Sequence, residues 1–324
     1  MNLEVLDNCD VTVLVDNVMD ILSTTSSSVT GHVPNVFKAG ATELSGKCLC
    51  CAHWGLSLVI AARQNDRKRT LLFDSGPEGK TVERNGSRLG IDFSSIDAVM
   101  FSHGHWDHVG GMLSALRLIN DAKGGEKIPV HLNDEMFVHR GLRVSDDKVI
   151  PFEDLPARRE LEEAGGVVRS IAEEHTVLDG MFYVSGEIPR VTAYEKGLPK
   201  HVKDAGKGWE PDPWIMDERY AAVHIGGKGI LVFTACSHAG VVNVLEDARE
   251  RFDPVPLYGV MGGFHLSGRE CEAIIPETIR DMQKFNLKLI VPGHCTGWRA
   301  VQKLVEVFGE DVVVMSAVGN SYSF

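Results

Sequence analysis

With 44% hydrophobic and 24% charged residues, the 324-residue chain has the composition of an ordinary soluble globular protein. The formal net charge of −12 disfavours a nucleic-acid partner, because binding to a phosphate backbone depends on clustered Lys and Arg. No run of eighteen apolar residues occurs, so no membrane span or membrane partner is expected. The acidic N-terminal residues lack the features of a secretory signal and predict a cytoplasmic location, with the seven cysteines as reduced thiols.

Strand patterns dominate the first quarter of the chain. Residues 11–15 are rich in β-branched side chains and predict a first strand, whereas residues 23–52 look irregular. Residues 56–60 and 70–73 flank a charged turn and predict a β-hairpin. The hairpin ends in Asp74, followed by Ser and Gly, at a place where a site residue often projects. The alternative for Asp74 is a turn residue that caps its own backbone.

The apolar residues 98–101 lead directly into a dense group of metal-ligand side chains. His103, His105, Asp107 and His108 lie within six residues. In an extended or tightly looped backbone, His103 and His105 project to the same side, while Asp107 and His108 reach a neighbouring position. This spacing predicts a strand that ends in a metal-binding turn, suited to two adjacent ions.

The middle of the chain is less periodic. Residues 112–119 have helical spacing, and residues 129–132 resemble another strand. The charge-rich residues 133–180 include an expected helix at 158–164. Residues 191–213 are rich in Gly and Pro and predict a long functional loop or lid. Three histidines without ligand-like spacing are interpreted as structural or surface residues: His131, His139 and His175.

In the last third of the chain, apolar strands are again followed by ligand-type side chains. The expected strands at 230–234, 257–261 and 287–291 precede, in this order, Cys236 with His238, His265, and His294. Ligand sites in α/β folds gather at the carboxyl ends of strands, so these side chains are expected to meet at one edge of the sheets. The other predicted elements are a strand at 221–225, helices at 241–251, 276–285 and 298–308, and a strand at 312–315.

Three motifs, taken in order, resemble the metallo-β-lactamase superfamily. They are the Phe73-Asp74-Ser75-Gly76 turn, the motif from His103 to His108, and Pro292-Gly293-His294. The resemblance implies an α/β fold, the four-layer αβ/βα sandwich, in which two β-sheets pack together with helices outside. It implies one domain over residues 1–324, and the irregular stretches then become loop insertions near 23–52, 133–180 and 191–213.

Four further stretches resemble one subgroup of this superfamily, the dihydropterin-type synthases. They are Glu187-Ile188-Pro189-Arg190, the segment from Cys236 to Gly240, the segment from Gly262 to Leu266, and the segment from Gly293 to Gly297. The chain departs from the wider superfamily at two positions. Ala235-Cys236 stands where a Gly-Asp pair usually provides a bridging carboxylate, and no third-motif histidine occurs near Asp217-Glu218. Cys236 and His238 are competent zinc ligands that could fill these roles.

The predicted site is a pair of metal ions. His103, His105 and His238 are assigned to one ion, Asp107, His108 and His294 to the second, and Cys236 is a further ligand. Zinc is the first choice for both ions, although manganese and iron accept similar ligands. Asp74 and Asp107 are the expected catalytic carboxylates, with Asp74 orienting the ligands or the attacking water. Substrate contacts are expected from His265, His53 and Arg190.

The favoured function is that of a metal-dependent hydrolase, which uses activated water on a small ester, lactone or phosphoester. One alternative is a synthase that joins a pterin to an arylamine, and another is a metabolite-binding protein with an incomplete metal pair. A redox enzyme with two irons is disfavoured, since the sequence shows no flavin or Fe–S signature. The expected partner is a small-molecule substrate, and self-association is left open.

Overall fold

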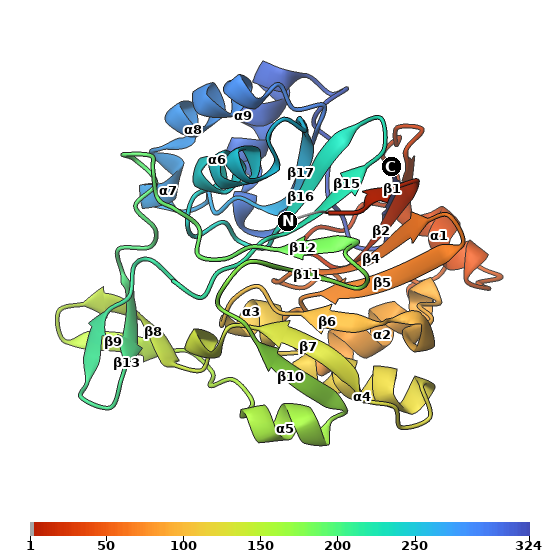
Figure 1. Cartoon of the computed structure of the whole chain (residues 1–324), viewed down its shortest axis with the longest axis horizontal. Helices are drawn as coiled ribbons and strands as arrows, with labels where there is room; N and C mark the ends of the chain where they lie inside the picture. Colours follow the sequence, from red (N-terminus) through yellow and green to blue (C-terminus); the bar gives the residue numbers. More distant parts are fainter. Residues whose placement is uncertain (1–2) are drawn as a thin grey trace.

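The computed structural model describes residues 3–324, and its two large β-sheets pack face to face (Figure 1). We call the eight-stranded one the first sheet and the seven-stranded one the second sheet. The strands of the first sheet are, in spatial order, β10 (Gly166–Ser170), β7 (Ile128–Leu132), β6 (Ala98–Met100), β5 (Arg67–Phe73), β4 (Ser57–Gln64), β2 (Asn8–Val15), β19 (Ser321–Ser323) and β3 (Val29–Thr30).

The second sheet comes mostly from the last half of the chain. Its strands run in the order β11 (His175–Val177), β12 (Phe182–Val184), β15 (Ala221–Ile225), β16 (Gly229–Thr234), β17 (Leu257–Gly263) and β18 (Leu289–Gly293), and β1 (Val5–Leu6) also pairs with β15. Strands β16, β17 and β18 are parallel, so their carboxyl ends lie at the same edge. This arrangement brings the residues that follow these strands close together.

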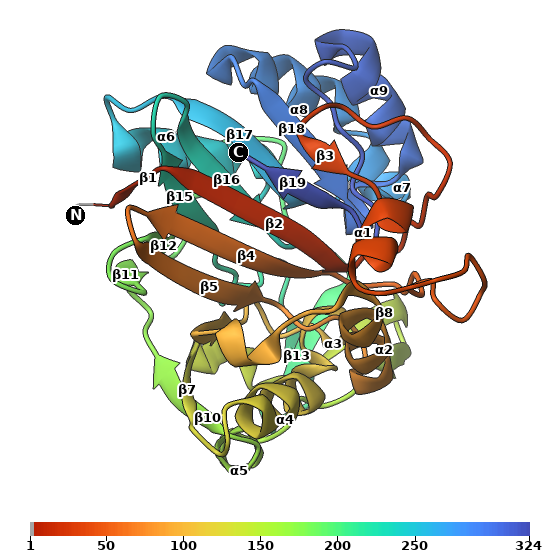
Figure 2. The same ribbon diagram turned by 90° about the vertical axis from the view of Figure 1, so that its right-hand side faces the viewer.

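Helices cover the outer face of each sheet, and Figures 1 and 2 show the resulting layers from two sides. The first sheet is covered by α2 (Gly79–Leu89), α4 (Met112–Ala122) and α5 (Arg158–Glu163). The second sheet is covered by α6 (Val241–Phe252), α8 (Ile275–Met282) and α9 (Trp298–Phe308). The predicted four-layer αβ/βα sandwich is therefore confirmed. The remaining helices are α1 (His32–Lys38), α3 (Trp106–Val109) and α7 (Arg269–Glu272), with 3-10 turns η1 (Phe93–Ser95), η2 (Asp134–Met136), η3 (Gln283–Phe285) and η4 (His294–Thr296).

Strand β5 shows why the strands of this fold are apolar on both faces. Leu71 and Phe73 belong to the core between the two sheets, together with Phe182 and Phe233 of the second sheet. Leu72 belongs instead to the core under α2 and α4. Successive side chains of a strand point to opposite faces, so a continuous apolar run marks a strand that is buried on both sides. The predicted hairpin of β4 and β5 is also present, with Leu58 opposite Phe73.

A small third sheet includes part of the predicted loop or lid at residues 191–213. Its strands are, in order, β14 (Trp209–Pro211), β13 (His201–Asp204), β8 (His139–Ser145) and β9 (Lys148–Pro151). β13 and β14 lie inside the expected loop, and β13 pairs with β8 of the charge-rich insertion. Short strands in a Gly-rich stretch show no clear alternation of apolar and polar residues. Here the strands are defined by hydrogen bonding to a segment far away in the sequence.

The prediction of a strand at 312–315 is wrong. Val313 makes only an isolated bridge to Ile290, and the last strand of the described chain is β19. Residues 23–52 are not wholly irregular either, because they include β3 and α1. β19 is three residues long and polar at both ends, so only its pairing with β2 and β3 defines it.

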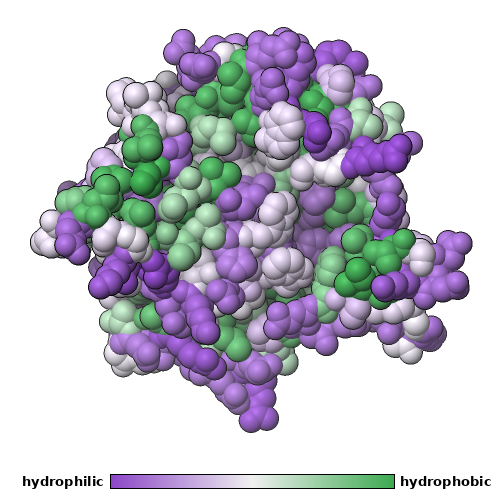
Figure 3. Space-filling view, turned by 180° about the vertical axis from the view of Figure 1, so that it is seen from behind, coloured by the Kyte–Doolittle hydropathy of each residue, from purple (hydrophilic) through white to green (hydrophobic). Residues whose placement is uncertain are grey.

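No helix within residues 3–324 has the length and apolar character needed to cross a membrane. The back of the molecule is hollowed near its centre, and hydrophobic residues gather on two sides of this hollow (Figure 3). The most exposed large hydrophobic side chains include Leu22, Val191 and Trp298.

Candidate functional site

The ends of five strands bring the predicted site residues together. His103 and His105 lie in the turn between β6 and α3, and Cys236, His265 and His294 follow β16, β17 and β18. The backbone is unusual at these ends. Four residues here have a positive φ of 42° to 60°, a region that non-glycine residues rarely adopt: Asp74, Ser237, His265 and His294. Such conformations cluster at functional sites.

The first ligand set consists of His103, His105 and His238. Nε2 of His103, Nδ1 of His105 and Nε2 of His238 lie 3.1 Å from one another. Three nitrogens around one zinc ion, each at about 2.0–2.1 Å, lie about 3.3 Å apart in a tetrahedral site. Burial, together with the neighbouring imidazoles, lowers the pKa of all three rings well below the usual value. Neutral rings keep the lone pairs that a metal needs, so this set fits a metal ion.

The second ligand set consists of Asp107, His108 and His294. Nε2 of His294 lies 3.2 Å from Nε2 of His108 and 3.3 Å from a carboxylate oxygen of Asp107. The same oxygen lies 4.0 Å from Nε2 of His108. One carboxylate and two imidazoles therefore face a common point, and this set also fits a metal ion.

Cys236 lies between the two ligand sets. Its Sγ is 3.1 Å from Nε2 of His108, and its side chain is buried. The sulfur also lies within 4.8 Å of a ring nitrogen of His103 on one side and of a ring nitrogen of His294 on the other. Cys236 thus lies where it could contact an ion held by either ligand set.

Asp74 holds the histidines in place and does not face the two ligand sets. Its carboxylate accepts hydrogen bonds from Nδ1 of His108 and from the backbone N–H and hydroxyl of Ser102, each at 2.8 Å. The Ser102 hydroxyl is in turn 2.9 Å from Nδ1 of His103. With Nδ1 as the donor in both rings, Nε2 is left free to bind a metal. Asp74 is therefore placed to orient the ligands, and its part in catalysis stays a prediction.

A buried ion pair that sequence reasoning missed holds the turn between His103 and His105. Asp217 accepts a hydrogen bond from the Gly104 N–H at 2.7 Å and pairs with the guanidinium of Arg140 at 2.5 Å. Arg140 also binds Asp212 at 3.0 Å, and all three charged side chains are buried. A Cβ on Gly104 would lie 2.4 Å from the carbonyl oxygen of Met136, so only glycine fits. Because the partners are far apart in sequence, no local signal could have identified them.

Glu218 supports the loop that carries His238. Its two carboxylate oxygens accept hydrogen bonds from the backbone N–H groups of His238 and Ala239, each at 2.7 Å. Burial raises the pKa of Glu218 to about 7, although these hydrogen bonds oppose the shift. Glu218 thereby positions the loop that carries His238, and His238 completes the first ligand set.

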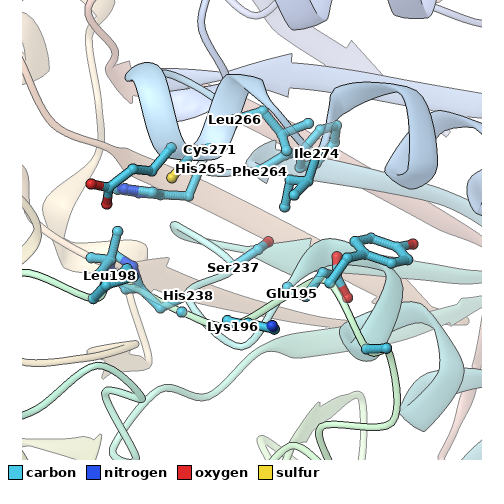
Figure 4. A pocket seen from close by; sticks show the side chains of 16 residues that line it. Glu195, Lys196, Leu198, Ser237, His238, Phe264, His265, Leu266, Cys271 and Ile274 are labelled. Atoms are coloured by element: carbon cyan, nitrogen blue, oxygen red, sulfur yellow. The ribbon is translucent and has the colours of Figure 1, made fainter.

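A cavity of about 380 Å³ opens beside the first ligand set (Figure 4). Its wall contains His238 and also His265, whose ring centroid lies 4.7 Å from that of His238. The predicted substrate residue His265 is thus placed where a ligand of the cavity would contact it. Apolar side chains form much of the remaining wall: Tyr194, Leu198, Phe264, Leu266 and Ile274.

Two predicted substrate residues lie elsewhere. The guanidinium of Arg190 donates to the carbonyl oxygens of Ile188 and Trp214, at 2.9 and 2.5 Å, and stacks on the Trp214 ring. The ring of His53 is exposed and faces Glu78 at 4.0 Å. Neither side chain lines the cavity beside the first ligand set, and their contact with substrate stays a prediction.

A histidine not predicted for the site lies close to it instead. The ring of His201, on β13, is 4.7 Å from that of His105, between centroids. Burial, with the charges of His265 and Arg140, lowers its pKa to about 3. The small third sheet thus contributes a neutral imidazole beside the first ligand set.

The chain is similar to known proteins in sequence and in fold. Residues 54–252 match the family model described as the metallo-beta-lactamase superfamily. The chain is 27% identical to the 7,8-dihydropterin-6-methyl-4-(beta-D-ribofuranosyl)-aminobenzene-5'-phosphate synthase of Methanocaldococcus jannaschii, over 79% of this chain and 85% of the relative. It is 32% identical to an uncharacterized protein of the same archaeon, over 79% of this chain and 89% of the relative.

Solved structures show the same fold. A metal-dependent hydrolase of the beta-lactamase superfamily matches with a TM-score of 0.69 and 20% identity, over 97% of this chain and 98% of that one. The metallo-beta-lactamase fold protein YhfI from Bacillus subtilis matches with a TM-score of 0.51 and 12% identity, over 98% of this chain and 100% of that one. The family model that matches residues 54–252, with the named relatives and the shared fold, shows that the chain is an enzyme of the metallo-beta-lactamase superfamily.

Proposed function

We propose that this protein is a hydrolase with two metal ions of the zinc class, acting on a small ester, lactone or phosphoester. The observation that carries the proposal is the adjacency of two complete ligand sets beside one cavity. The rings of His103 and His108, one from each set, have centroids only 4.4 Å apart. Ions bound in these sets would lower the pKa of water toward neutrality and polarise a carbonyl or phosphoryl oxygen.

The protein's own groups would orient the reactants. Burial opposes ionisation of Asp107, but the neighbouring His108 and His294 lower the pKa of its carboxyl far below the usual range. Asp107 is therefore an anion that can hold and orient a water molecule. His265, on the cavity wall, would contact the substrate, and the apolar wall would receive the substrate's less polar part.

The second candidate function is synthesis of a pterin–arylamine bond. It is favoured by the 27% identity to a protein named as such a synthase. In this reaction an arylamine nitrogen replaces water as the nucleophile. A carbon–nitrogen bond would form at the pterin methylene carbon, the carbon–oxygen bond to a diphosphate would break, and the amine would lose a proton.

Metal content is the first test of the centre. We expect about two ions per chain in protein purified without chelator, and a clear loss in His103→Ala and in His238→Ala. The variant His139→Ala, changed on the small third sheet, serves as the control and should keep its metal. Less than one ion in the parent, or full metal content in both site variants, would contradict the dinuclear centre and favour a metabolite-binding protein.

The second test separates the two reactions. The metal-loaded protein is incubated with a dihydropterin diphosphate, with and without an arylamine, and with a panel of esters, lactones and phosphoesters. Turnover without amine, with oxygen from isotopically labelled water in the product, would support the hydrolase. Turnover that strictly requires the amine would support the synthase and overturn the hydrolase proposal.

A further inference from the structure

Two buried cysteines from different strand ends form a pair at the centre of the site. Cys236 follows β16 and Cys295 lies in η4, after β18, and their sulfur atoms are 3.3 Å apart. Both side chains are buried and neither is in a disulfide. Cys295 is not among the ligands expected from the sequence, because it directly follows His294 and lacks a second nearby cysteine in the chain.

The fold makes room for this pair. A Cβ on Gly263, at the end of β17, would lie 2.7 Å from the sulfur of Cys295. The same Cβ would lie 2.3 Å from the carbonyl oxygen of Ala235, so a residue larger than glycine would press on both the strand end before Cys236 and the thiol of Cys295. The sulfur of Cys295 also lies 3.6 Å from the backbone carbonyl oxygen of Cys236.

The pair has the surroundings of a metal ligand set. Cys236, His294 and Cys295 offer one ligand atom each, and the three atoms lie within 4.8 Å of one another. On the opposite side, the sulfur of Cys236 is 3.1 Å from Nε2 of His108 in the second ligand set. The two thiols thus lie next to the second ligand set, with which their group shares His294.

We propose that Cys236 and Cys295 both bind the ion on the His294 side as thiolates, which makes this position selective for a thiophilic ion of the zinc class. The proposal rests on the dinuclear centre of the proposed function and specifies one of its positions. On binding, each thiol releases one proton to solvent and forms one sulfur–metal bond. Thiolates favour zinc-like ions over manganese and magnesium, which prefer oxygen ligands. The two positions would then differ, with only nitrogen ligands on one side and with sulfur, nitrogen and the carboxylate oxygen of Asp107 on the other.

Cobalt substitution tests the proposal without relying on activity. Thiolate-bound Co²⁺ has a charge-transfer absorption in the near ultraviolet, whereas Co²⁺ with only nitrogen and oxygen ligands lacks it. We expect the band in the cobalt-loaded parent, and a loss of about half of its intensity in Cys236→Ser and in Cys295→Ser, because each removes one of two sulfur ligands. Cys9→Ala, at a buried cysteine of strand β2, and Cys51→Ser, at an exposed one, are matched controls that should keep the full band.

The outcomes separate this proposal from the dinuclear centre. A parent that binds about two cobalt ions but shows no band would overturn the thiolate proposal and leave the centre intact. An unchanged band in Cys295→Ser would overturn it as well. Less than one bound ion in the parent would contradict both proposals. If a serine variant fails to fold, X-ray absorption of the zinc-loaded parent decides: sulfur neighbours of zinc support the proposal, and their absence overturns it.

Discussion

At the scale of single residues, the site depends on hydrogen bonds behind the ligands as much as on the ligands. Asp74 accepts from Nδ1 of His108 and so fixes which nitrogen of that ring carries the proton. The Ser102 hydroxyl donates to Asp74 and therefore accepts from Nδ1 of His103, which fixes the proton of that ring in the same way. The free Nε2 atoms of the two rings then face different ligand sets. One carboxylate thus prepares a ligand for each of the two positions.

Replacing Asp74 with Asn should weaken metal binding while leaving the chain folded. The amide offers one acceptor oxygen where the carboxylate serves three donors, so the His108 ring loses its fixed orientation. We expect a fall of about 10–100-fold in metal affinity, measured by competition with a chelator. Asp97→Asn is the matched control, because Asp97 accepts from the Thr70 N–H on the same sheet and touches no ligand. Unchanged affinity in Asp74→Asn would contradict the positioning role.

Replacing Arg140 with Met should destabilise the protein strongly. The change leaves Asp212 and Asp217 buried without their partner, and breaking a buried ion pair in this way costs about 3–5 kcal/mol. The measurement is unfolding by denaturant with metal present. Arg159→Met, which breaks an exposed pair with Glu163, should change the stability little. Similar stabilities of the two variants would show that the Arg140 pair does not hold the fold.

At the scale of elements, the long apolar strands and amphipathic helices were predictable, since each has a clear period. β5, α4, α6 and α9 lie within a few residues of their predicted bounds. β13, β14 and β19 were not predictable, because their order comes from pairing with segments far away in the sequence. The backbone conformation at the strand ends was not predictable either, because the positive φ values there depend on packing and are not visible in the local sequence pattern.

A histidine pair lies between the two large sheets and should make the protein sensitive to acid. His131 on β7 and His175 on β11 have ring nitrogens 3.4 Å apart. Burial, then the charges of His175 and Arg169, lowers the pKa of His131 from 6.5 to about 4. Above pH 6.5 the ring is neutral in the folded and unfolded chains. Between about pH 6.5 and 4 the unfolded chain takes up the proton first, so stability falls as the pH falls.

The variant His131→Gln should remove this acid sensitivity. The parent is expected to lose at most about 3 kcal/mol between pH 6.5 and 4 through this residue, and less if water screens the partly exposed ring. Unfolding by denaturant at several pH values measures the difference between parent and variant. His53→Gln, at an exposed ring, should keep the pH profile of the parent. A constant difference between parent and His131→Gln over this range would contradict the assignment.

At the scale of the whole molecule, the ligand sets connect the two sheets. His103, His105, Asp107 and His108 follow β6 of the first sheet, whereas Cys236, His238 and His294 follow strands of the second. The sequence allowed this set to be predicted, because ligand-type residues after apolar strands are visible locally. The sequence did not reveal Arg140, Asp217 and Glu218. Asp217 accepts from the backbone of Gly104, 113 residues away, and pairs with Arg140, 77 residues away. Glu218 accepts from the backbone of Ala239, 21 residues away.

Removing the metals should therefore lower the stability of the entire molecule. Each ion would link side chains from both sheets, and a ligand present at 100 times its dissociation constant stabilises the folded state by about 2.7 kcal/mol. We expect the thermal midpoint to fall by several degrees after treatment with chelator and to recover with zinc. His103→Ala should show a smaller shift. An unchanged midpoint after proven metal loss would contradict a structural link through the centre.

The place of β19 has a consequence for how the chain reaches this structure. β19 lies between β2 and β3, and Figure 2 shows it next to strands that precede it by about three hundred residues in the sequence. During synthesis on the ribosome, the first sheet has a gap at this point until residues 321–323 emerge. The second sheet and its helices are by then complete. Until then the edge of β2 that faces β19 has no strand partner, and an unpaired strand edge is a place where other chains can pair.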